Sequence, residues 1–243
     1  MKTIAANILI VLFLLISPAL SDLINIDNCH YMKGLKLSEE RFVLLWSSHS
    51  YETSEVFAQI YSNDGTHIGS RITVSDQVGS NIGGLSGVNL GNGHFVFGYT
   101  LTWNPVDTYL VVYDMEGNEI QRESYDERIG ALSKCDEGIV LNTYIEYEND
   151  ASLNDIWIQR IDMTTFSYGS RRELSSRRDY DQDFVDVASV PNGGSFIIWS
   201  DRSNAFMSSH SYCSIQKISS GGFADGTNKG VPMSDEALIC SEP

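Results

Sequence analysis

Phe95-Val96-Phe97-Gly98-Tyr99 is an apolar segment that closes on an aromatic residue, and related segments recur three more times along the chain. Each is followed by a second apolar segment and then by a turn. A repeat of about 50 residues built from strands is typical of a β-propeller or a related β array. The other closing segments are Phe42-Val43-Leu44-Leu45-Trp46, Ile139-Val140-Leu141-Asn142-Thr143-Tyr144 and Phe196-Ile197-Ile198-Trp199, and the second segments lie at 58–61, 110–113, 158–161 and 215–218.

Each copy of the repeat reads as four strands, with an outer strand before the closing segment and another after the second segment. Tight turns such as Gly91-Asn92-Gly93 join the first two strands, because glycine and asparagine adopt the positive φ that short hairpins require. No stretch of the repeats predicts a helix. We therefore expect an all-β, β-propeller-like fold of four repeats of about 55 residues, either four-bladed or an open, partial propeller. The outer strands are expected at 34–37, 86–90, 128–132 and 185–190, and at 72–74, 119–121, 172–174 and 231–233.

Two segments resemble a repeat found in large secreted surface proteins of bacteria and protists. One is Val187-Ala188-Ser189-Val190-Pro191-Asn192-Gly193-Gly194-Ser195-Phe196-Ile197-Ile198-Trp199-Ser200, and the other is Ala58-Gln59-Ile60-Tyr61-Ser62-Asn63-Asp64-Gly65-Thr66-His67-Ile68-Gly69. That repeat carries a Gly-Gly-x-Phe-Val-Val-x-Trp strand and a Gln-x-Phe-x-x-x-Gly-x-x-x-Gly hairpin. The resemblance implies propeller blades and a role in adhesion or at the extracellular surface, with no catalytic residues to carry over.

Residues 1–21 have the pattern of a secretory signal peptide. Lys2 precedes the apolar run 8–16, and small residues follow around Ala19. The run is too short to cross a hydrocarbon core, which needs about 20 residues. We therefore expect a secreted, extracellular protein in which residues 22–243 form a single β-propeller-like repeat domain without membrane insertion.

The chain is strongly acidic, with a formal net charge of −16. Such a charge repels nucleic acid and anionic membrane surfaces. Extracellular glycans and proteins remain as partners, and the chain itself is a further one, because an unpaired strand edge favours homo-oligomers.

The four cysteines allow up to two disulfides in an oxidising compartment, with three possible pairings. Cys29 and Cys240 lie near the two ends of the repeat region, and a circular fold would bring these ends together. We therefore favour a Cys29–Cys240 disulfide, while Cys213 also fits a buried free thiol.

The connections between the closing segment and the second segment are long, and each carries an aromatic residue. Long loops on a rigid scaffold are where binding residues concentrate. Four flat side chains suit stacking on sugars or anchoring a protein partner. The alternative is that each ring packs over its own blade as a lid. The candidate ligand-binding residues are Tyr51, Trp103, Tyr147 and Phe206.

Acidic residues, Glu146 and Asp155 among them, also collect in the long loops, and the densest group is Asp179-Tyr180-Asp181-Gln182-Asp183. In an extended segment, Asp179, Asp181 and Asp183 would face the same way and could bind calcium, which prefers oxygen ligands. The group lacks the glycine and distal glutamate of an EF-hand loop. A solvated acidic surface is the alternative, and no motif requires any other cofactor.

Catalytic patterns are weak throughout the sequence. The five histidines never pair at metal-ligand spacing, and so acidic a chain makes any chosen carboxylate pair uninformative. The leading hypothesis is a secreted, non-enzymatic protein that binds an extracellular glycan or protein through the long-loop face of the propeller. The alternatives are a structural surface protein that self-assembles into oligomers or filaments, and a glycan hydrolase.

Overall fold

The computed structural model describes residues 29–49, 54–75, 81–102, 107–125, 127–147, 154–174, 180–190, 193–203 and 211–220. In these ranges the chain forms strands and turns only, so the all-β expectation is confirmed. No helix that is long and apolar enough to cross a membrane occurs in the described ranges.

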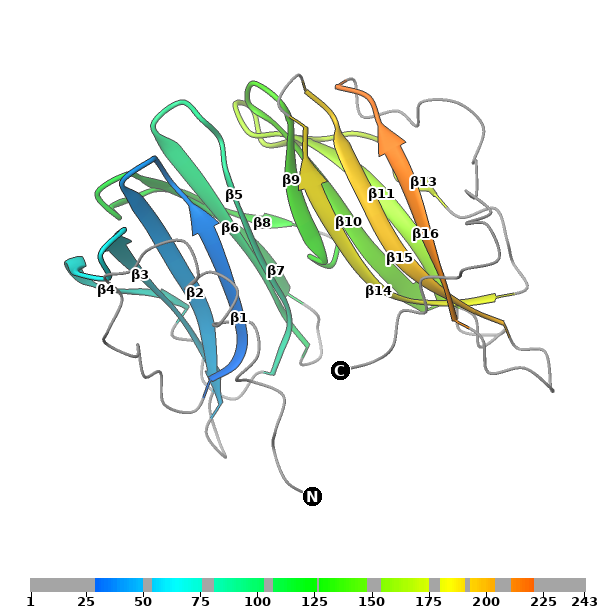
Figure 1. Cartoon of the computed structure of the whole chain (residues 1–243), viewed down its shortest axis with the longest axis horizontal. Coiled ribbons are helices and arrows are strands. Elements are labelled where there is room, and N and C mark those ends of the chain that lie inside the picture. Colours follow the sequence, from blue (N-terminus) through cyan, green and yellow to red (C-terminus); the bar gives the residue numbers. More distant parts are fainter. Residues whose placement is uncertain are drawn as a thin grey trace. The chain divides into compact units, whose positions relative to one another are not determined.

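Each repeat folds into its own antiparallel sheet, and the strands of a sheet follow one another in sequence (Figure 1). The four predicted repeats are therefore four blade-like sheets, and the fold is β-propeller-like. The first sheet contains β1 (Cys29–Lys36), β2 (Arg41–His49), β3 (Ser54–Ser62) and β4 (His67–Ser75). The second contains β5 (Ile82–Asn89), β6 (His94–Leu101), β7 (Asp107–Asp114) and β8 (Glu119–Tyr125).

The last two sheets depart from the four-strand pattern. In the third, the final strand is split into two short pieces that both pair with β11. In the fourth, the described residues supply three strands, and the strand expected at 231–233 lies outside them. The third sheet contains β9 (Ala131–Asp136), β10 (Ile139–Tyr147), β11 (Asn154–Asp162), β12 (Ser167–Tyr168) and β13 (Arg172–Glu173), and the fourth contains β14 (Tyr180–Ser189), β15 (Ser195–Ser203) and β16 (Ser211–Ile218).

One predicted strand is displaced along the sequence. The strand expected at 128–132 is β9, which begins only at Ala131. Gly130 lies so close to β10 that a Cβ atom there would come within 2.2 Å of the carbonyl oxygen of Thr143. The predicted bounds were wrong, because the strand continues beyond residue 132 up to a tight turn at Gly138, whose φ is 67°.

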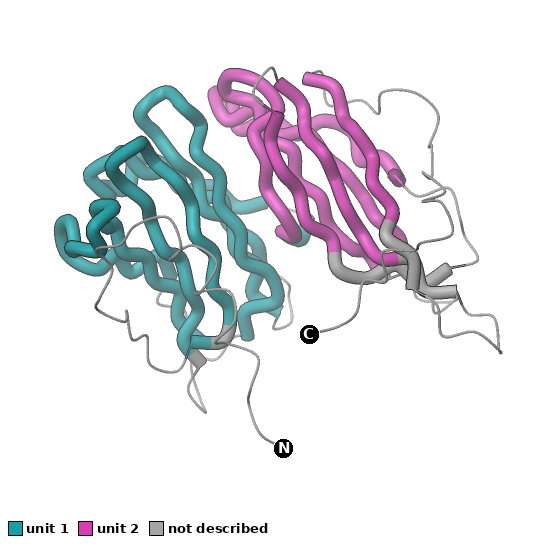
Figure 2. The backbone as a smooth tube through the Cα atoms, in the orientation of Figure 1, with its two compact units in different colours: residues 1–128, 243 teal, residues 129–242 magenta. Residues whose placement is uncertain are grey.

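The described chain forms two compact units, and each is considered by itself (Figure 2). Unit 1 extends to Arg128 and holds the first two sheets; unit 2 begins at Ile129 and holds the last two.

The core of unit 1 lies between its two sheets. Val43 and Leu45 of β2 belong to one buried cluster with Phe95 and Phe97 of β6. The rings of Phe95 and Tyr113 stack with centroids 5.6 Å apart. Burying a side chain of this size contributes about 1.5 to 3 kcal/mol. The apolar closing segments therefore hold one sheet against the next.

Unit 2 is built in the same way around a smaller cluster. Leu141 of β10 and Ile158 of β11 pack with Ile197 and Trp199 of β15 and with Ile218 of β16. Each of these side chains is buried.

A glutamine in the third strand of the first sheet and of the third sheet has a structural role that explains part of the repeat. Gln59 Nε2 donates hydrogen bonds to the carbonyls of Ile68 and Gly69, at 3.1 and 3.4 Å. Gln159 Nε2 donates to the carbonyl of Gly169 at 2.8 Å, ten residues further on in both cases. Both glutamines are buried, and their hydrogen bonds hold the segment that follows the turn against the strand that precedes it. The ten-residue spacing from glutamine to glycine therefore reflects a hydrogen bond that holds the two sides of the hairpin together.

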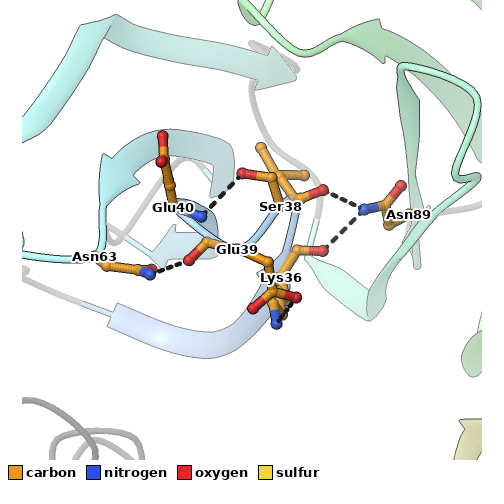
Figure 3. A network of polar contacts seen from close by, with 7 residues as sticks. Lys36, Ser38, Glu39, Glu40, Asn63 and Asn89 are labelled. Atoms are coloured by element: carbon orange, nitrogen blue, oxygen red, sulfur yellow. Dashed lines mark hydrogen bonds and ion pairs between the residues drawn. The ribbon is translucent and has the colours of Figure 1, made fainter.

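The tight turns of neighbouring sheets are tied together within each unit. In unit 1, Asn89 Nδ2 donates to the carbonyls of Lys36 and Leu37 at 3.0 and 2.7 Å (Figure 3). Asn63 reaches back to the carbonyl of Glu39 in the same network. The Asn89 bonds join the first sheet to the second at the turn end, defined as the end of a sheet where its glycine turns lie, and the Asn63 bond joins the two turns of the first sheet.

Unit 2 has equivalent ties at its turn end. The amide of Gly194 donates to the carbonyl of Cys135 at 2.6 Å. The buried hydroxyls of Ser133 and Ser195 lie 2.6 Å apart. The turn end is thus the hydrogen-bonded, fixed end of each unit.

Candidate functional site

The long connections leave each sheet at the end opposite to the glycine turns, because the strands are antiparallel. We call this the loop end. The flanking strands pair up to the edge of the described residues, with His49 opposite Ser54 and Leu101 opposite Asp107. In unit 2, the strands pair in the same way up to the edge of the described residues, with Tyr147 opposite Asn154 and Arg202 opposite Ser211. The candidate loops are therefore the tips of closed hairpins.

The predicted aromatic residues fall at or beyond these hairpin tips. Tyr51, Trp103 and Phe206 lie outside the described residues. Tyr147 was expected in a loop, but it is the last residue of β10 and pairs with Asn154. The loop prediction was wrong at this position because the ladder between β10 and β11 extends through Glu146 and Asp155.

Of the predicted calcium ligands, too, some lie inside the described residues and one lies outside them. Asp179 lies outside the described residues, whereas Asp181 and Asp183 belong to β14. The segment is extended there, as expected, with Asp181 opposite Arg202 and Asp183 opposite Ser200 on β15. Among the side chains that the structure describes, no three acidic, histidine or cysteine groups come together as a metal site.

Asp155 was predicted in a loop with the other acids, but the structure places it in β11. Its side chain is only 7% exposed. It lies directly opposite Glu146, which is half-buried. The acidic surface expected at this loop end is therefore smaller than the sequence suggested.

The loop end of unit 1 rests on a polar and aromatic layer that sequence reasoning missed. The rings of Tyr99 and Tyr109 stack across β6 and β7, with centroids 5.4 Å apart. The buried hydroxyls of Thr100 and Thr108 lie 3.1 Å apart. Paired aromatic and threonine residues on adjacent strands stabilise a sheet. This layer fixes the strand ends that carry the loop containing Trp103.

Tyr99 also belongs to a charged cluster between the two sheets of unit 1. Arg122 donates to the Tyr99 hydroxyl and pairs with Glu119 at 2.7 Å. Burial raises the pKa of Tyr99 and of Tyr113 above the ordinary tyrosine value. The hydrogen bonds that Arg122 donates to Glu119 raise the pKa of Arg122, so the guanidinium stays charged. No local sequence pattern connects Tyr99 with Arg122, since they come from different strands.

Unit 2 carries a cation–π cluster beside Tyr147. The guanidinium carbon of Arg171 lies 5.1 Å from the ring centre of Trp157. Arg171 also bonds the carboxylate of Glu146 at 3.0 Å. A charge over an aromatic face at a partly exposed site contributes about 0.5 to 1 kcal/mol. The cluster braces β10 and β11 where their connection begins.

The cysteines that the structure describes are unpaired. Cys29 and Cys135 form no disulfide within the described residues, and burial raises the pKa of both thiols. The side chain of Cys213 and all of Cys240 lie outside the described residues. The Cys29–Cys240 disulfide therefore stays a prediction.

Four sequential antiparallel sheets with tied turns and long hairpin tips define a β-propeller-like repeat protein. No protein-family model and no curated protein sequence matches the chain. It is similar to a solved protein of unknown function from Dyadobacter fermentans, with a TM-score of 0.58 and 10% identity over 80% of this chain. At that identity, the similarity shows the fold alone.

Weaker similarities extend to proteins with named activities. The subtype N10 neuraminidase-like protein of A/little yellow-shouldered bat/Guatemala matches with a TM-score of 0.49 and 9% identity over 81% of this chain. A Synechocystis apocarotenoid oxygenase matches with a TM-score of 0.48 and 11% identity over 82% of this chain. The chain spans 66%, 57% and 49% of the lengths of these three solved proteins, in the order given.

Proposed function

We propose that this protein is a secreted, non-enzymatic binding protein that engages an extracellular glycan or protein through its loop ends. The observation that carries the proposal is the asymmetry of each unit. Hydrogen bonds such as Gly194 to Cys135 tie the turn ends, whereas the hairpins open into longer connections at the loop ends. A fixed scaffold with longer loops at one end is the usual arrangement of a binding site.

The chemistry of the loops supports a glycan or protein ligand. Tyr51, Trp103 and Phe206 belong to the connections, and Tyr147 is the last residue before one. Aromatic rings provide flat, rigid contact area at a small cost in side-chain entropy. The net charge of −16 disfavours nucleic acid, and the signal-like residues 1–21 favour an extracellular ligand.

Calcium binding at Asp179, Asp181 and Asp183 is a separate part of the proposal. The extended backbone of β14 supports it, because alternate residues of a strand face the same side. Calorimetric titration with calcium tests it. We expect heat of binding that is lost when Asp181→Asn and Asp183→Asn are combined, and no heat with the parent protein would contradict it.

A glycan array followed by titration calorimetry tests the binding site. We expect Trp103→Ala and Tyr51→Ala each to weaken binding at least about ten-fold, the loss typical of a buried aromatic anchor. Tyr168→Ala is the matched control, because Tyr168 is an exposed aromatic of β12 at the turn end. Absence of binding to every glycan and extracellular protein tested, or equal loss in the control, would contradict the proposal. Hydrolysis of a bound glycan would instead favour the hydrolase.

A further inference from the structure

The turn that joins β5 to β6 contains an asparagine followed by a glycine (Figure 1). Gly91, Asn92 and Gly93 are exposed on unit 1. The amide of Leu90 donates to the carbonyl of His94 at 3.0 Å and closes the turn. The side-chain carbonyl of an asparagine can react with the next backbone amide, and a glycine there has no Cβ to shield its nitrogen. This turn therefore places an electrophile beside an unshielded nucleophile.

The amide of Gly93 is open for such a reaction. Among the described residues, no hydrogen bond uses this amide as a donor. Gly93 has a φ of 85°, and a Cβ atom built on it would meet no atom within 4 Å. A free amide can lose its proton and turn toward a neighbouring group without first breaking a hydrogen bond. Gly93 thus supplies an accessible nitrogen.

The side-chain carbonyl of Asn92 is in contact with an imidazole. Its Oδ1 lies 3.3 Å from Nδ1 of His94. An amide oxygen only accepts hydrogen bonds, so His94 is the donor in this contact. A donor on the oxygen stabilises the negative charge that develops there when the carbonyl is attacked. His94 therefore makes the Cγ atom of Asn92 more reactive.

We propose that Asn92 is a site of deamidation through a succinimide. The nitrogen of Gly93 gives its proton to solvent and bonds to Cγ of Asn92, while the side-chain nitrogen takes up a proton and leaves as ammonia. Water then opens the ring at either carbonyl. Opening at the former side-chain carbonyl gives aspartate, and opening at the main-chain carbonyl gives isoaspartate, whose backbone is longer by one methylene. The overall change consumes one water and releases one ammonia.

The same dipeptide occurs in unit 2 in a different setting. Asn192 lies outside the described residues, but Gly193 lies within them. The amide of Gly193 donates to the carbonyl of Val190 at 3.0 Å, and a Cβ atom on Gly193 would lie 3.0 Å from the carbonyl oxygen of Cys135. Ring closure at Asn192 has to break that hydrogen bond, so deamidation there is slower. The chain thus supplies its own matched control.

A related pair in unit 1, Asp64 followed by Gly65, is held in place. The amide of Gly65 donates to the carbonyl of Ser62 at 2.9 Å. Oδ1 of Asp64 accepts a hydrogen bond from the amide of Thr66 at 3.0 Å. Both groups that would have to react are engaged, so isoaspartate forms at Asn92 and not at Asp64.

Peptide mapping by mass spectrometry, during incubation of the full chain at neutral pH, tests the proposal. We expect Asn92 to convert about five-fold faster than Asn192, the factor that one amide hydrogen bond provides, with isoaspartate among the products. His94→Ala slows conversion of Asn92 by about two-fold and leaves the rate at Asn192 unchanged. Asn92→Gln abolishes conversion at this position. Conversion of Asn92 no faster than that of Asn192, or a rate at Asn92 that His94→Ala leaves unchanged or raises, would overturn the proposal.

The product is expected to weaken the turn. Isoaspartate lengthens the backbone between Gly91 and Gly93, which disturbs the hydrogen bond from Leu90 to His94. After separation by ion-exchange chromatography, the isoaspartate form should melt about 2 to 4 °C below the parent protein. Asn92→Asp keeps the length of the backbone and melts with the parent. Equal melting of the isoaspartate form and the parent would contradict this effect. The site does not depend on the proposed function, because it lies at the turn end and not at a loop end.

Discussion

Arg122 on β8 donates a 2.7 Å hydrogen bond to the hydroxyl of Tyr99 on β6, and its other terminal nitrogen reaches the carbonyl of Val74 on β4 at 2.9 Å. One guanidinium therefore bonds both sheets of unit 1. Glu119, on the same strand, holds it in place. The two sheets meet across an apolar core, and this side chain provides a polar tie between them.

Replacement of Arg122 is expected to destabilise unit 1. Arg122→Gln leaves the Tyr99 hydroxyl and the Val74 carbonyl without their charged donor, which costs about 2 to 3 kcal/mol. Urea denaturation, followed by tryptophan fluorescence, measures the change. Arg172→Gln is the control, because Arg172 is exposed on β13, and it changes the free energy of unfolding by less than about 0.5 kcal/mol. Equal effects of the two substitutions would contradict a specific role for Arg122.

Stability is expected to fall at alkaline pH because of the buried tyrosines. Burial raises the pKa of Tyr99 and Tyr113 above 10 in the folded protein. As pH rises past 10, the unfolded chain loses these protons first, so the free energy of unfolding falls. Below pH 10, Tyr99 and Tyr113 do not change the free energy of unfolding with pH. Tyrosinate absorbance distinguishes them: Tyr99→Phe and Tyr113→Phe are each expected to remove a late-titrating component, and a variant that removes none would contradict this account.

Two turn glycines with the same backbone conformation should differ in their tolerance of alanine. Gly93 and Gly194 have φ of 85° and 86°. A Cβ atom at Gly93 meets nothing within 4 Å, whereas at Gly194 it would lie 2.2 Å from the carbonyl oxygen of Ile218. Gly93→Ala is expected to cost about 1 to 2 kcal/mol, from backbone strain alone. Gly194→Ala costs at least about 3 kcal/mol, because backbone must move. Similar losses in thermal unfolding would contradict the tight contact.

The turn-end tie at Asn89 depends on a donor group. Its amide nitrogen donates to the carbonyls of Lys36 and Leu37 (Figure 3). Asn89→Ala removes the bonds and costs about 1 to 2 kcal/mol. Asn89→Asp is expected to cost more near neutral pH, because a carboxylate facing two carbonyls repels them. Its deficit shrinks toward the alanine value below pH 4, where the carboxyl is protonated. A deficit for Asn89→Asp that stays constant from pH 7 to pH 3 would contradict this account.

Most of the fold was predictable because it depends on local sequence. Recurring apolar segments and turn glycines predicted four repeats of hairpins, and the segment from Gln59 to Gly69 resembled the hairpin motif of a known repeat. The errors have a common cause. Tyr147 and Asp155 were assigned to loops because their polar neighbours resemble a loop, whereas the ladder between β10 and β11 extends through them. Cross-strand pairing, which the sequence does not display, decided where these strands end.

The candidate site was less predictable than the scaffold. Sequence reasoning placed the loops at one end of the sheets but missed the polar and aromatic layer beneath them. Tyr99 and Arg122 are 23 residues apart, and Arg171 and Glu146 are 25 residues apart. Neither pair follows a local spacing rule, since each forms only when strands from different hairpins pack together.

The sequence by itself determined the class of the fold, the number of repeats and the end of each sheet that carries long loops, because strand periodicity and turn chemistry act over a few neighbouring residues. Only the tertiary structure decided which apolar positions become core. Val43 is fully buried in one cluster with Phe95 and Phe97 of the second sheet, whereas Ile120 of the outer strand β8 is 54% exposed. Burial depends on whether another sheet packs against that face, and no local pattern encodes the presence of that sheet.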